Sequence, residues 1–263
     1  MPDSNKQTLA DRMKEYEANF DYKIMRRCPV ILRLDGRSFS RLTKSLEKPS
    51  EKFINAMANT TLDVAKDIEG CVFGYCQSDE ITLVLKNDQS IYSMPWFDNR
   101  IQKMVSIAAA EATYAFGKNL EKQELELKRG IFDCRVFSVP NTIELVNNLI
   151  YRQRDCMRNA ISLVADAQLR KRLGKGAALK LLLNKGSKER LQLLFEKCGI
   201  DFWKDYPSAV IRGVGAYRKP EEKIGKDNVP IIRNSWVLDY NIPEFDKDAA
   251  LIIKAYEFVE KEK

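Results

Sequence analysis

The spacing of apolar residues divides this chain into a regular series of helices and strands. Apolar positions recur with helical periodicity over residues 8–19, after Ser50 and over residues 95–117. Short apolar runs bounded by turn residues predict four strands. They are 29–35, 71–76, 81–85 and 131–139. Between residues 29 and 140 the order of elements is therefore β-α-β-β-α-β.

This order is typical of a ferredoxin-like α+β fold, an antiparallel sheet with two helices on one face. The two middle strands form a hairpin through the tight connection Gln77-Ser78-Asp79. In such a sheet the first strand and the hairpin are neighbours at the centre. We therefore expect a palm-like domain at residues 1–140 that holds Asp35 close to Asp79.

The character of the sequence changes after Pro140. Asn141 and Glu144 resemble a capping box at the start of a helix over 142–172. We expect a second, mainly helical domain at 141–263, whose further elements follow from the same patterns. These are helices over 175–199 broken near Gly186, a β-hairpin at 209–218 and 231–240 with a long basic loop, and a helix at 247–262.

The composition fits a folded protein with a phosphate-rich partner. Hydrophobic residues make up 44% of the 263 residues, which allows a sizeable core, and 44 lysines and arginines exceed 37 acids for a net charge of +7. There is no histidine. This excludes Ser-His-Asp and Cys-His catalysis and imidazole-bound zinc, so any catalysis depends on carboxylates, lysine, arginine, hydroxyls or metal-bound water.

The sequence also indicates a compartment. The six cysteines show no CxxC spacing, which is typical of a reduced intracellular protein. Residues 1–17 are polar and lack the apolar core of a secretory signal, and no run approaches the roughly 20 apolar residues of a membrane span. We expect a cytoplasmic protein that does not enter a membrane.

Three acids lie where strands of the predicted sheet end. Asp35 closes an apolar run just before Gly36, and the pair Asp79-Glu80 lies between two β-prone runs. Asp35 alone could be an ordinary turn residue. Three converging carboxylates, however, would repel one another without a cation, and their oxygens suit Mg²⁺. The pattern indicates two-metal phosphoryl or nucleotidyl transfer.

Groups suited to phosphate surround these acids. The segment Gly36-Arg37-Ser38-Phe39-Ser40 could be a plain turn or an anion-binding nest for a triphosphate. Arg33, Arg37 and Lys48 add cations. Asp133 and Arg135 share one strand face and could form a structural ion pair or part of a phosphate site.

The long helix after residue 141 carries a polar face. Arg152, Asp155 and Asn159 share this face, with Gln153 beside it, and solvation is its simplest explanation. Further along the chain a lysine cluster could be a solvated surface or a contact to an RNA backbone. Its members are Lys171, Lys175, Lys180, Lys185 and Lys188.

Four motifs together resemble the histidine-tRNA guanylyltransferase family, including its bacterial-type guanylyltransferase-like members. Their order and spacing match over roughly residues 10–220. The motifs are Arg33-Leu34-Asp35-Gly36-Arg37-Ser38-Phe39, Gln77-Ser78-Asp79-Glu80, Phe132-Asp133-x-Arg135 and Tyr151-Arg152-Gln153-x-Asp155-Cys156.

The resemblance implies roles for individual residues. Asp35, the Gly36 carbonyl and Asp79 would bind two Mg²⁺ ions, and Asp35, Asp79 and the adjacent Glu80 would be the catalytic acids. Nucleotide binding would involve Arg33, Asp35, Gly36, Arg37, Ser38, Phe39, Ser40, Lys48, Ser78, Asp79, Arg135 and Asn159, of which Lys48, Arg135 and Asn159 would contact phosphates. Arg152, Asp155 and Lys188 would contact tRNA.

The resemblance also implies a reaction, a 3′-to-5′ nucleotide addition to tRNA. ATP adenylylates the RNA 5′-phosphate, and the 3′-hydroxyl of an incoming nucleotide, GTP or another NTP, then displaces AMP. A homotetramer built as a dimer of dimers is the expected assembly. Met157-Arg158-Asn159-Ala160 replaces the family's His-Ile-Asn-Asn, and Ser40 replaces a histidine. Both differences favour template-dependent tRNA 5′-end repair over dedicated guanylyl addition to histidine tRNA.

Two other functions fit the same order of elements. A palm-type nucleotide cyclase would need the acids but no basic surface of tRNA size. A non-catalytic RNA-recognition domain shares the βαββαβ order, but it would carry aromatic residues on its central strands, and strand 29–35 has none.

Overall fold

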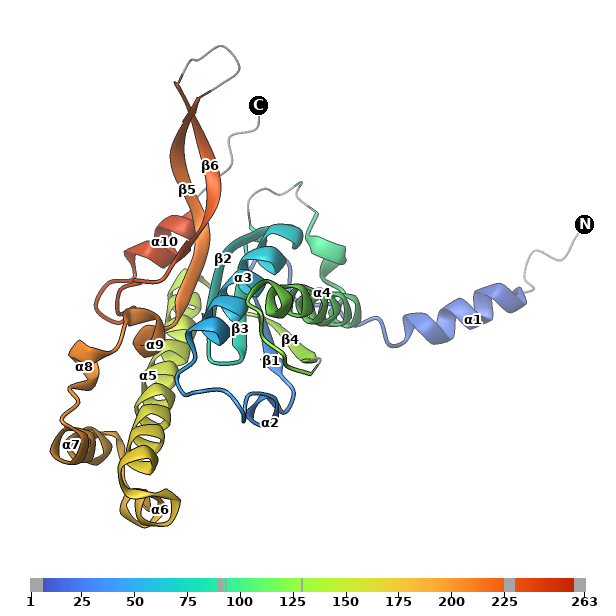
Figure 1. The fold of residues 1–263 in the computed structure, drawn as a ribbon. Coiled ribbons are helices and arrows are strands. Elements are labelled where there is room, and N and C mark those ends of the chain that lie inside the picture. Colours follow the sequence, from blue (N-terminus) through green and yellow to red (C-terminus); the bar gives the residue numbers. More distant parts are fainter. Residues whose placement is uncertain (1–6, 89–91, 93, 129, 225–229, 258–263) are drawn as a thin grey trace, which may run out of the picture.

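In the computed structural model, the predicted strands and long helices follow one another along the chain in the predicted order. The structure describes residues 7–88, 92, 94–128, 130–224 and 230–257. Figure 1 shows one sheet with helices on either side. The elements of its palm-like part are β1 (Val30–Gly36), α3 (Glu51–Asp67), β2 (Cys71–Gln77), β3 (Glu80–Leu85), α4 (Ile101–Lys122) and β4 (Phe132–Ser138).

The sheet is antiparallel and has the strand order β4-β1-β3-β2-β5-β6. Its first four strands have the order of a ferredoxin-like fold, which confirms the predicted fold class. The hairpin of β5 (Val214–Ile224) and β6 (Pro230–Asp239) extends the same sheet, because β5 pairs with β2. The division of the chain at residue 140 stays a prediction.

The two faces of the sheet are covered by different helices. Leu32, Leu34 and Leu83 point into a core shared with α3 and α4. Ile31 and Val84 point the opposite way, because side chains alternate along a strand, and they pack with α5 (Thr142–Leu173) and α10 (Ala250–Glu257). Helices thus cover one face of the palm-like part, and the later part of the chain covers the other.

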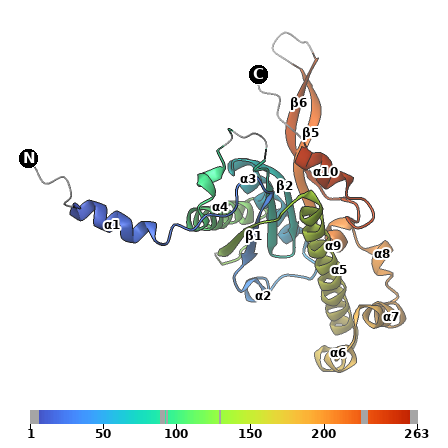
Figure 2. The ribbon, with the colours of Figure 1, turned by 180° about the vertical axis from the view of Figure 1, so that it is seen from behind.

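The helix α5 is the longest element and extends well beyond the sheet. Asn141 caps it, since its side chain accepts a hydrogen bond of 2.9 Å from the Glu144 N–H. The reciprocal bond of the expected capping box, from the Asn141 N–H to the Glu144 side chain, is not found among the described residues. Shorter helices pack on α5, from its middle to its far end, and on one another (Figures 1 and 2). They are α6 (Lys175–Leu182), α7 (Ser187–Cys198), α8 (Phe202–Asp205) and α9 (Ser208–Arg212).

Three predicted boundaries are wrong. The helix expected to start at Pro95 starts at Ile101, because a short 3₁₀ turn with positive φ angles, η1 (Trp96–Asn99), comes first. Its Asp98 forms ion pairs with Lys23 and Arg26, which tie the turn to the segment before β1. Residues 209–212 are helical, and pairing of β5 with β6 continues into the expected basic loop, whose residues 225–229 lie outside the described residues. The last helix starts at Ala250, and its expected end at 262 also lies outside them.

The N-terminal helix projects from the body of the molecule. This helix, α1 (Leu9–Ala18), confirms the predicted element and points away from the sheet (Figures 1 and 2). Leu9, Met13 and Tyr16 are all exposed. Separately, the described residues contain no helix with the length and apolar character needed to span a membrane.

A buried glutamine attaches the C-terminal segment to α5. The Gln153 side chain donates to the Pro243 carbonyl (2.9 Å) and accepts from the Phe245 N–H (2.7 Å). Phe245 in turn packs edge-on against Phe73 and Tyr75 of β2. Gln153 therefore positions the loop that leads into α10.

Replacing this glutamine should destabilise the fold. In Gln153→Leu both backbone groups lose their partners in a buried site, and we expect the free energy of unfolding to fall by about 2–4 kcal/mol. Urea denaturation would measure it. Gln192→Leu, on the exposed face of α7, is the matched control and should change it by less than about 0.5 kcal/mol. Equal effects of the two substitutions would contradict this role.

Candidate functional site

Two carboxylates lie at the same rim of the sheet. Asp35 is near the end of β1, and Asp79 is in the two-residue turn between β2 and β3. The Gly36 N–H donates to the Asp79 carbonyl at 3.0 Å, which fixes the end of β1 against the turn. This part of the sequence-based site is therefore assembled as the topology predicts.

The position of Asp79 disfavours its charged form. Burial raises the pKa of its carboxyl, and the nearby Asp35 carboxylate raises it further, while hydrogen bonds and Lys48 act in the opposite direction. No ion pair to either carboxylate occurs in the described part of the chain. Among the described side chains, therefore, no cation is paired directly with these two carboxylates, and Lys48 acts on Asp79 only from a distance.

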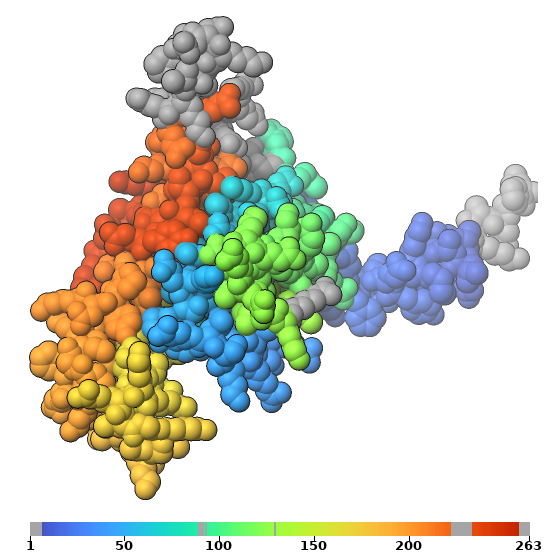
Figure 3. Space-filling view, in the orientation of Figure 1, coloured from blue at the N-terminus to red at the C-terminus, as the bar shows by residue number. Residues whose placement is uncertain are grey.

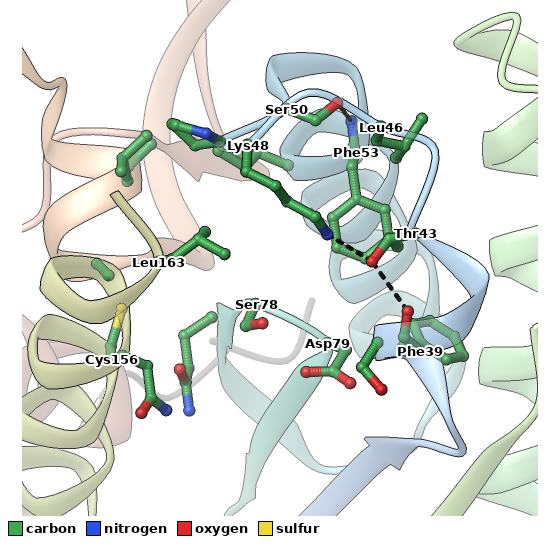
Figure 4. A pocket seen from close by; sticks show the side chains of 18 residues that line it. Phe39, Thr43, Leu46, Lys48, Ser50, Phe53, Ser78, Asp79, Cys156 and Leu163 are labelled. Carbon is green, nitrogen blue, oxygen red and sulfur yellow. Dashed lines mark hydrogen bonds between the residues drawn. The ribbon is translucent and has the colours of Figure 1, made fainter. Parts of the chain in front are cut away.

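A pocket of about 290 Å³ opens beside Asp79 (Figure 4). Its walls come from the β2–β3 turn, the segment between β1 and α3, the middle of α5 and the short helix α9. The lining residues are Phe39, Ser40, Thr43, Leu46, Lys48, Pro49, Ser50, Phe53, Ile54, Gln77, Ser78, Asp79, Cys156, Asn159, Ala160, Leu163, Ala209 and Val210. The pocket is apolar on one side and has Asp79 and Lys48 on the other.

Lys48 extends across this pocket toward the acidic rim. Its ammonium group donates to the Thr43 hydroxyl (2.6 Å), which itself donates to the Phe39 carbonyl (2.9 Å; Figure 4). Partial burial lowers the pKa of Lys48, and the Asp79 carboxylate raises it. The lysine is the cation that the structure places at this pocket.

The turn after Asp35 has the backbone of an anion-binding segment. Ser38 has a left-handed conformation (φ 60°), as does Ser78 before Asp79 (φ 50°), a strained state for residues other than glycine. Ser38 begins the short helix α2 (Phe39–Leu42), whose first N–H groups have no partner within the helix. Backbone amides and serine hydroxyls are thus available near both acids.

An aromatic side chain fixes this turn to the core. The Phe39 ring is fully buried and lies 5.1 Å, centroid to centroid, from both Phe116 and Phe132. A Cβ atom on Gly36 would lie 2.6 Å from the Phe39 ring, so this close contact requires glycine. Phe39, predicted to bind nucleotide, can therefore offer only its backbone to a ligand.

The expected cluster of three acids is wrong, because Glu80 does not join Asp35 and Asp79. The Glu80 carboxylate accepts two hydrogen bonds from the Arg152 guanidinium, both of 2.6 Å, and the two side chains are 10% and 7% exposed. Arg152 also donates to Asp155 at 2.9 Å. Glu80 therefore pairs with α5 instead of turning toward Asp35 and Asp79, and Arg152 is not part of a solvated face.

Arginines and acids alternate on the open part of the sheet beside Asp35. Asp35 is opposite Asp133 on β4, and Arg33 is opposite Arg135. No Asp133–Arg135 ion pair, one of the two possibilities raised by the sequence, is found among the described residues. Arg135 is exposed and Arg33 partly so.

The remaining predicted residues are distributed along the site and beyond it. Arg37, Ser38 and Ser40 are exposed on the turn, and Asn159 lines the pocket. Asp155 forms ion pairs with Arg152 and Arg158. Lys188 is exposed at the start of α7, near the far end of α5 (Figure 1).

Sequence reasoning missed several residues of the pocket wall. Thr43, Phe53, Leu163 and Val210 are among them. Leu163 follows Asn159 by one helical turn and could have been found from the helical spacing. Val210 comes from a segment predicted as a strand, so no sequence signal placed it here.

The donor set at the rim fits a hard divalent cation. Within the described ranges no group of three or more Asp, Glu or Cys side chains could hold a metal ion. What remains are the Asp35 and Asp79 carboxylates and backbone carbonyls such as that of Gly36. Oxygen donors of this kind suit Mg²⁺, which retains several waters and needs few protein ligands.

Comparison with known proteins gives consistent matches. The family model for tRNAHis guanylyltransferase matches residues 10–140. An uncharacterized protein of Acanthamoeba polyphaga mimivirus is 36% identical over 181 residues, which are 60% of this chain and 62% of that protein. A probable tRNA(His) guanylyltransferase of Mus musculus is 31% identical over 57% of this chain and 52% of its own length. The chain thus spans less than two thirds of these relatives.

A solved structure matches over nearly the whole chain. It is a bacterial tRNA(His) guanylyltransferase-like protein in complex with ATP, with a TM-score of 0.82 and 29% identity. The match covers 96% of this chain and 100% of that one. A protein of the same description in complex with GTP matches with a TM-score of 0.75 and 28% identity.

The ion pair between Glu80 and Arg152 should be essential to stability. In Arg152→Met the Glu80 carboxylate is left buried without a partner, and we expect a loss of about 3–5 kcal/mol in the free energy of unfolding. The double variant Glu80→Met with Arg152→Met removes both charges and should recover most of this loss. Denaturant unfolding of the three proteins tests it. A single variant as stable as the unsubstituted protein would disprove the proposed coupling.

Proposed function

We propose that the chain, whose residues 10–140 match the family model for tRNAHis guanylyltransferase, is a nucleotidyltransferase that adds nucleotides to the 5′ end of tRNA in the 3′-to-5′ direction. The observation that carries the proposal is the pair of unneutralised carboxylates, Asp35 and Asp79, beside a pocket containing Lys48. Phosphoryl groups are transferred by such arrangements of acids and cations.

The pocket supports nucleotide binding. The solved structures that hold ATP and GTP match 96% of this chain. We assign the nucleoside to the apolar wall near Phe53 and Leu163. The triphosphate would lie along residues 35–40 and Ser78, where backbone amides are available, and Lys48 would neutralise its charge.

Divalent ions complete this proposal. Asp35, Asp79 and the Gly36 carbonyl would hold them. Bound there, they would screen the phosphate oxygens and polarise the phosphorus under attack. Burial and mutual repulsion, which raise the pKa of Asp79, are effects that a nearby cation would relieve.

The reaction would consist of two in-line displacements at phosphorus. In the first, an oxygen of the RNA 5′-phosphate attacks the α-phosphorus of ATP, and pyrophosphate leaves. In the second, the 3′-hydroxyl of an incoming nucleotide attacks the activated 5′-phosphate, and AMP leaves. Lys48 and the arginines of the open sheet surface would stabilise the charge that develops on the phosphate oxygens. Neither step requires a histidine, which the chain lacks.

Repair of tRNA 5′ ends is the activity we favour over dedicated addition of guanylate to histidine tRNA. Ser40 and the Met157-Arg158 pair replace histidines and their neighbours in the family pattern. The match to the bacterial guanylyltransferase-like protein also covers that chain completely, whereas about half of the mouse enzyme is covered. A homotetramer remains part of the proposal, and the exposed apolar face of α1 is consistent with contacts between subunits.

A tRNA lacking its first nucleotide tests the function. The protein would be incubated with this RNA, Mg²⁺, ATP and each NTP in turn, and labelled ATP would reveal the adenylylated RNA. We expect 5′ extension directed by the opposite strand, and its loss on chelation of divalent ions. Cyclic products formed from NTPs without RNA would instead indicate a nucleotide cyclase, and binding without extension would indicate an RNA-recognition protein.

Replacing one acid should abolish chemistry and spare the fold. Asp79→Asn removes a buried charge whose pKa is raised, so we expect the free energy of unfolding to be unchanged or higher. The rate of 5′ extension should fall about 100-fold or more, because the cation would lose a ligand. Asp67→Asn, at the exposed end of α3, is the matched control and should keep full activity. Extension by Asp79→Asn at an undiminished rate would refute the assignment.

A further inference from the structure

One short segment of the chain has a net positive charge as large as that of the whole protein. Residues 170–190 contain eight lysines and arginines and one acid, Glu189, for a net charge of +7. The whole chain also has a net charge of +7, from 44 basic and 37 acidic residues. The other 242 residues therefore contain equal numbers of each sign, 36 and 36.

We call residues 170–190 the basic tip. It comprises the end of α5, all of α6 and the start of α7. Arg170 and Lys185 form ion pairs of 2.7 Å with Asp166 and Glu189. The other exposed basic residues of the tip form no ion pair in the described part of the chain, and they are Lys171, Arg172, Lys175, Lys180 and Lys188.

The basic tip begins on the side of α5 that lines the pocket, at Arg170. Asn159 and Leu163 line the pocket, and Arg170 falls on the same stripe of the helix because it follows Asn159 by eleven residues and Leu163 by seven. Eleven residues of helix correspond to about 17 Å. A ligand that enters the pocket and follows this face therefore reaches the tip.

The region around α2, across the indentation from the basic tip, is also basic. Arg37, Arg41 and Lys44, on and around α2, are exposed and without an ion pair among the described residues. Both ribbon views place α2 level with the outer half of α5. In the space-filling view the surface is indented between the blue segment that contains α2 and the yellow segment that contains α6 (Figure 3). A polyanion leading into the pocket would thus have cations on two sides.

We propose that the basic tip binds the phosphate backbone of the RNA substrate, about five base steps from the 5′ end that reacts. The distance follows from about 17 Å of helix and a spacing of about 3.4 Å per step along one strand. This inference rests on the proposed function, which places the RNA 5′ end at the pocket. Contacts from lysine and arginine to phosphates do not distinguish one base sequence from another, so the tip would bind different tRNAs with similar affinity.

The favoured partner is RNA, although an anionic membrane shares its charge. Leu179 and Leu183 are exposed beside the lysines of α6, as on helices that bind membrane surfaces. The basic tip lies in line with the pocket, however, and only a ligand long enough to contact both would use this arrangement. An RNA does so, and the experiment distinguishes the two partners.

The test is the triple variant Lys171→Gln, Arg172→Gln and Lys175→Gln in the full chain. Its affinity for a tRNA lacking the first nucleotide would be measured across salt concentrations. We expect binding to weaken at least tenfold at low salt, and the slope of log affinity against log salt to become shallower by about two to three. Adenylylation of a 5′-phosphorylated dinucleotide should stay within twofold of the unsubstituted rate, because that RNA is too short to reach the tip.

The matched control neutralises three exposed residues remote from the pocket, Lys66, Lys122 and Lys128. Their replacement by glutamine changes the net charge equally and should leave the slope unchanged. Equal losses in both triple variants would show a general charge effect and overturn the proposal. So would unchanged tRNA binding by the tip variant, with or without lost binding to phosphatidylserine vesicles. If the unsubstituted protein adenylylates no RNA, the proposed function fails, and the salt dependence still decides whether the tip binds RNA.

Discussion

The buried ion pair between Glu80 and Arg152 is the constraint on which the site depends. It joins the first residue of β3, which directly follows the turn containing Asp79, to α5, and both this turn and α5 line the pocket. Two charges removed from water are stabilising only when each is fully bonded, and here the guanidinium binds the carboxylate through two nitrogens. The pair therefore fixes where the turn containing Asp79 lies relative to Asn159 and Leu163.

Because of this ion pair, the adjacent acids Asp79 and Glu80 have different roles. The charge of Glu80 is balanced by Arg152, and this ion pair holds β3 against α5. Asp79, one residue earlier, has no arginine and keeps a raised pKa through burial and the nearby Asp35. The same difference separates a structural acid from one suited to bind a cation, and it arises where the turn containing Asp79 gives way to β3, which begins at Glu80.

The sequence allowed the palm-like part to be predicted well, because its signals are local. Alternating apolar runs, the Ser50 and Asn141 caps and the tight turn at Ser78 all act within a few residues. The pairing of Glu80 with Arg152 joins residues 72 apart and could not be read from spacing. The delayed start of α4 depends on Asp98 meeting Lys23 and Arg26, and the pocket wall at Val210 depends on the packing of α9 against α5. Such contacts exist only in the folded chain.

The contact between Gly36 and Phe39 has a consequence for ligand binding. Because the aromatic ring seats the turn in the core, the backbone amides of residues 38–40 are ordered by the folding of the protein itself. A ligand would then lose little free energy in arranging this segment, which is the advantage of preorganisation. Conversely, a substitution that loosened the ring would weaken affinity without touching a single ligand contact.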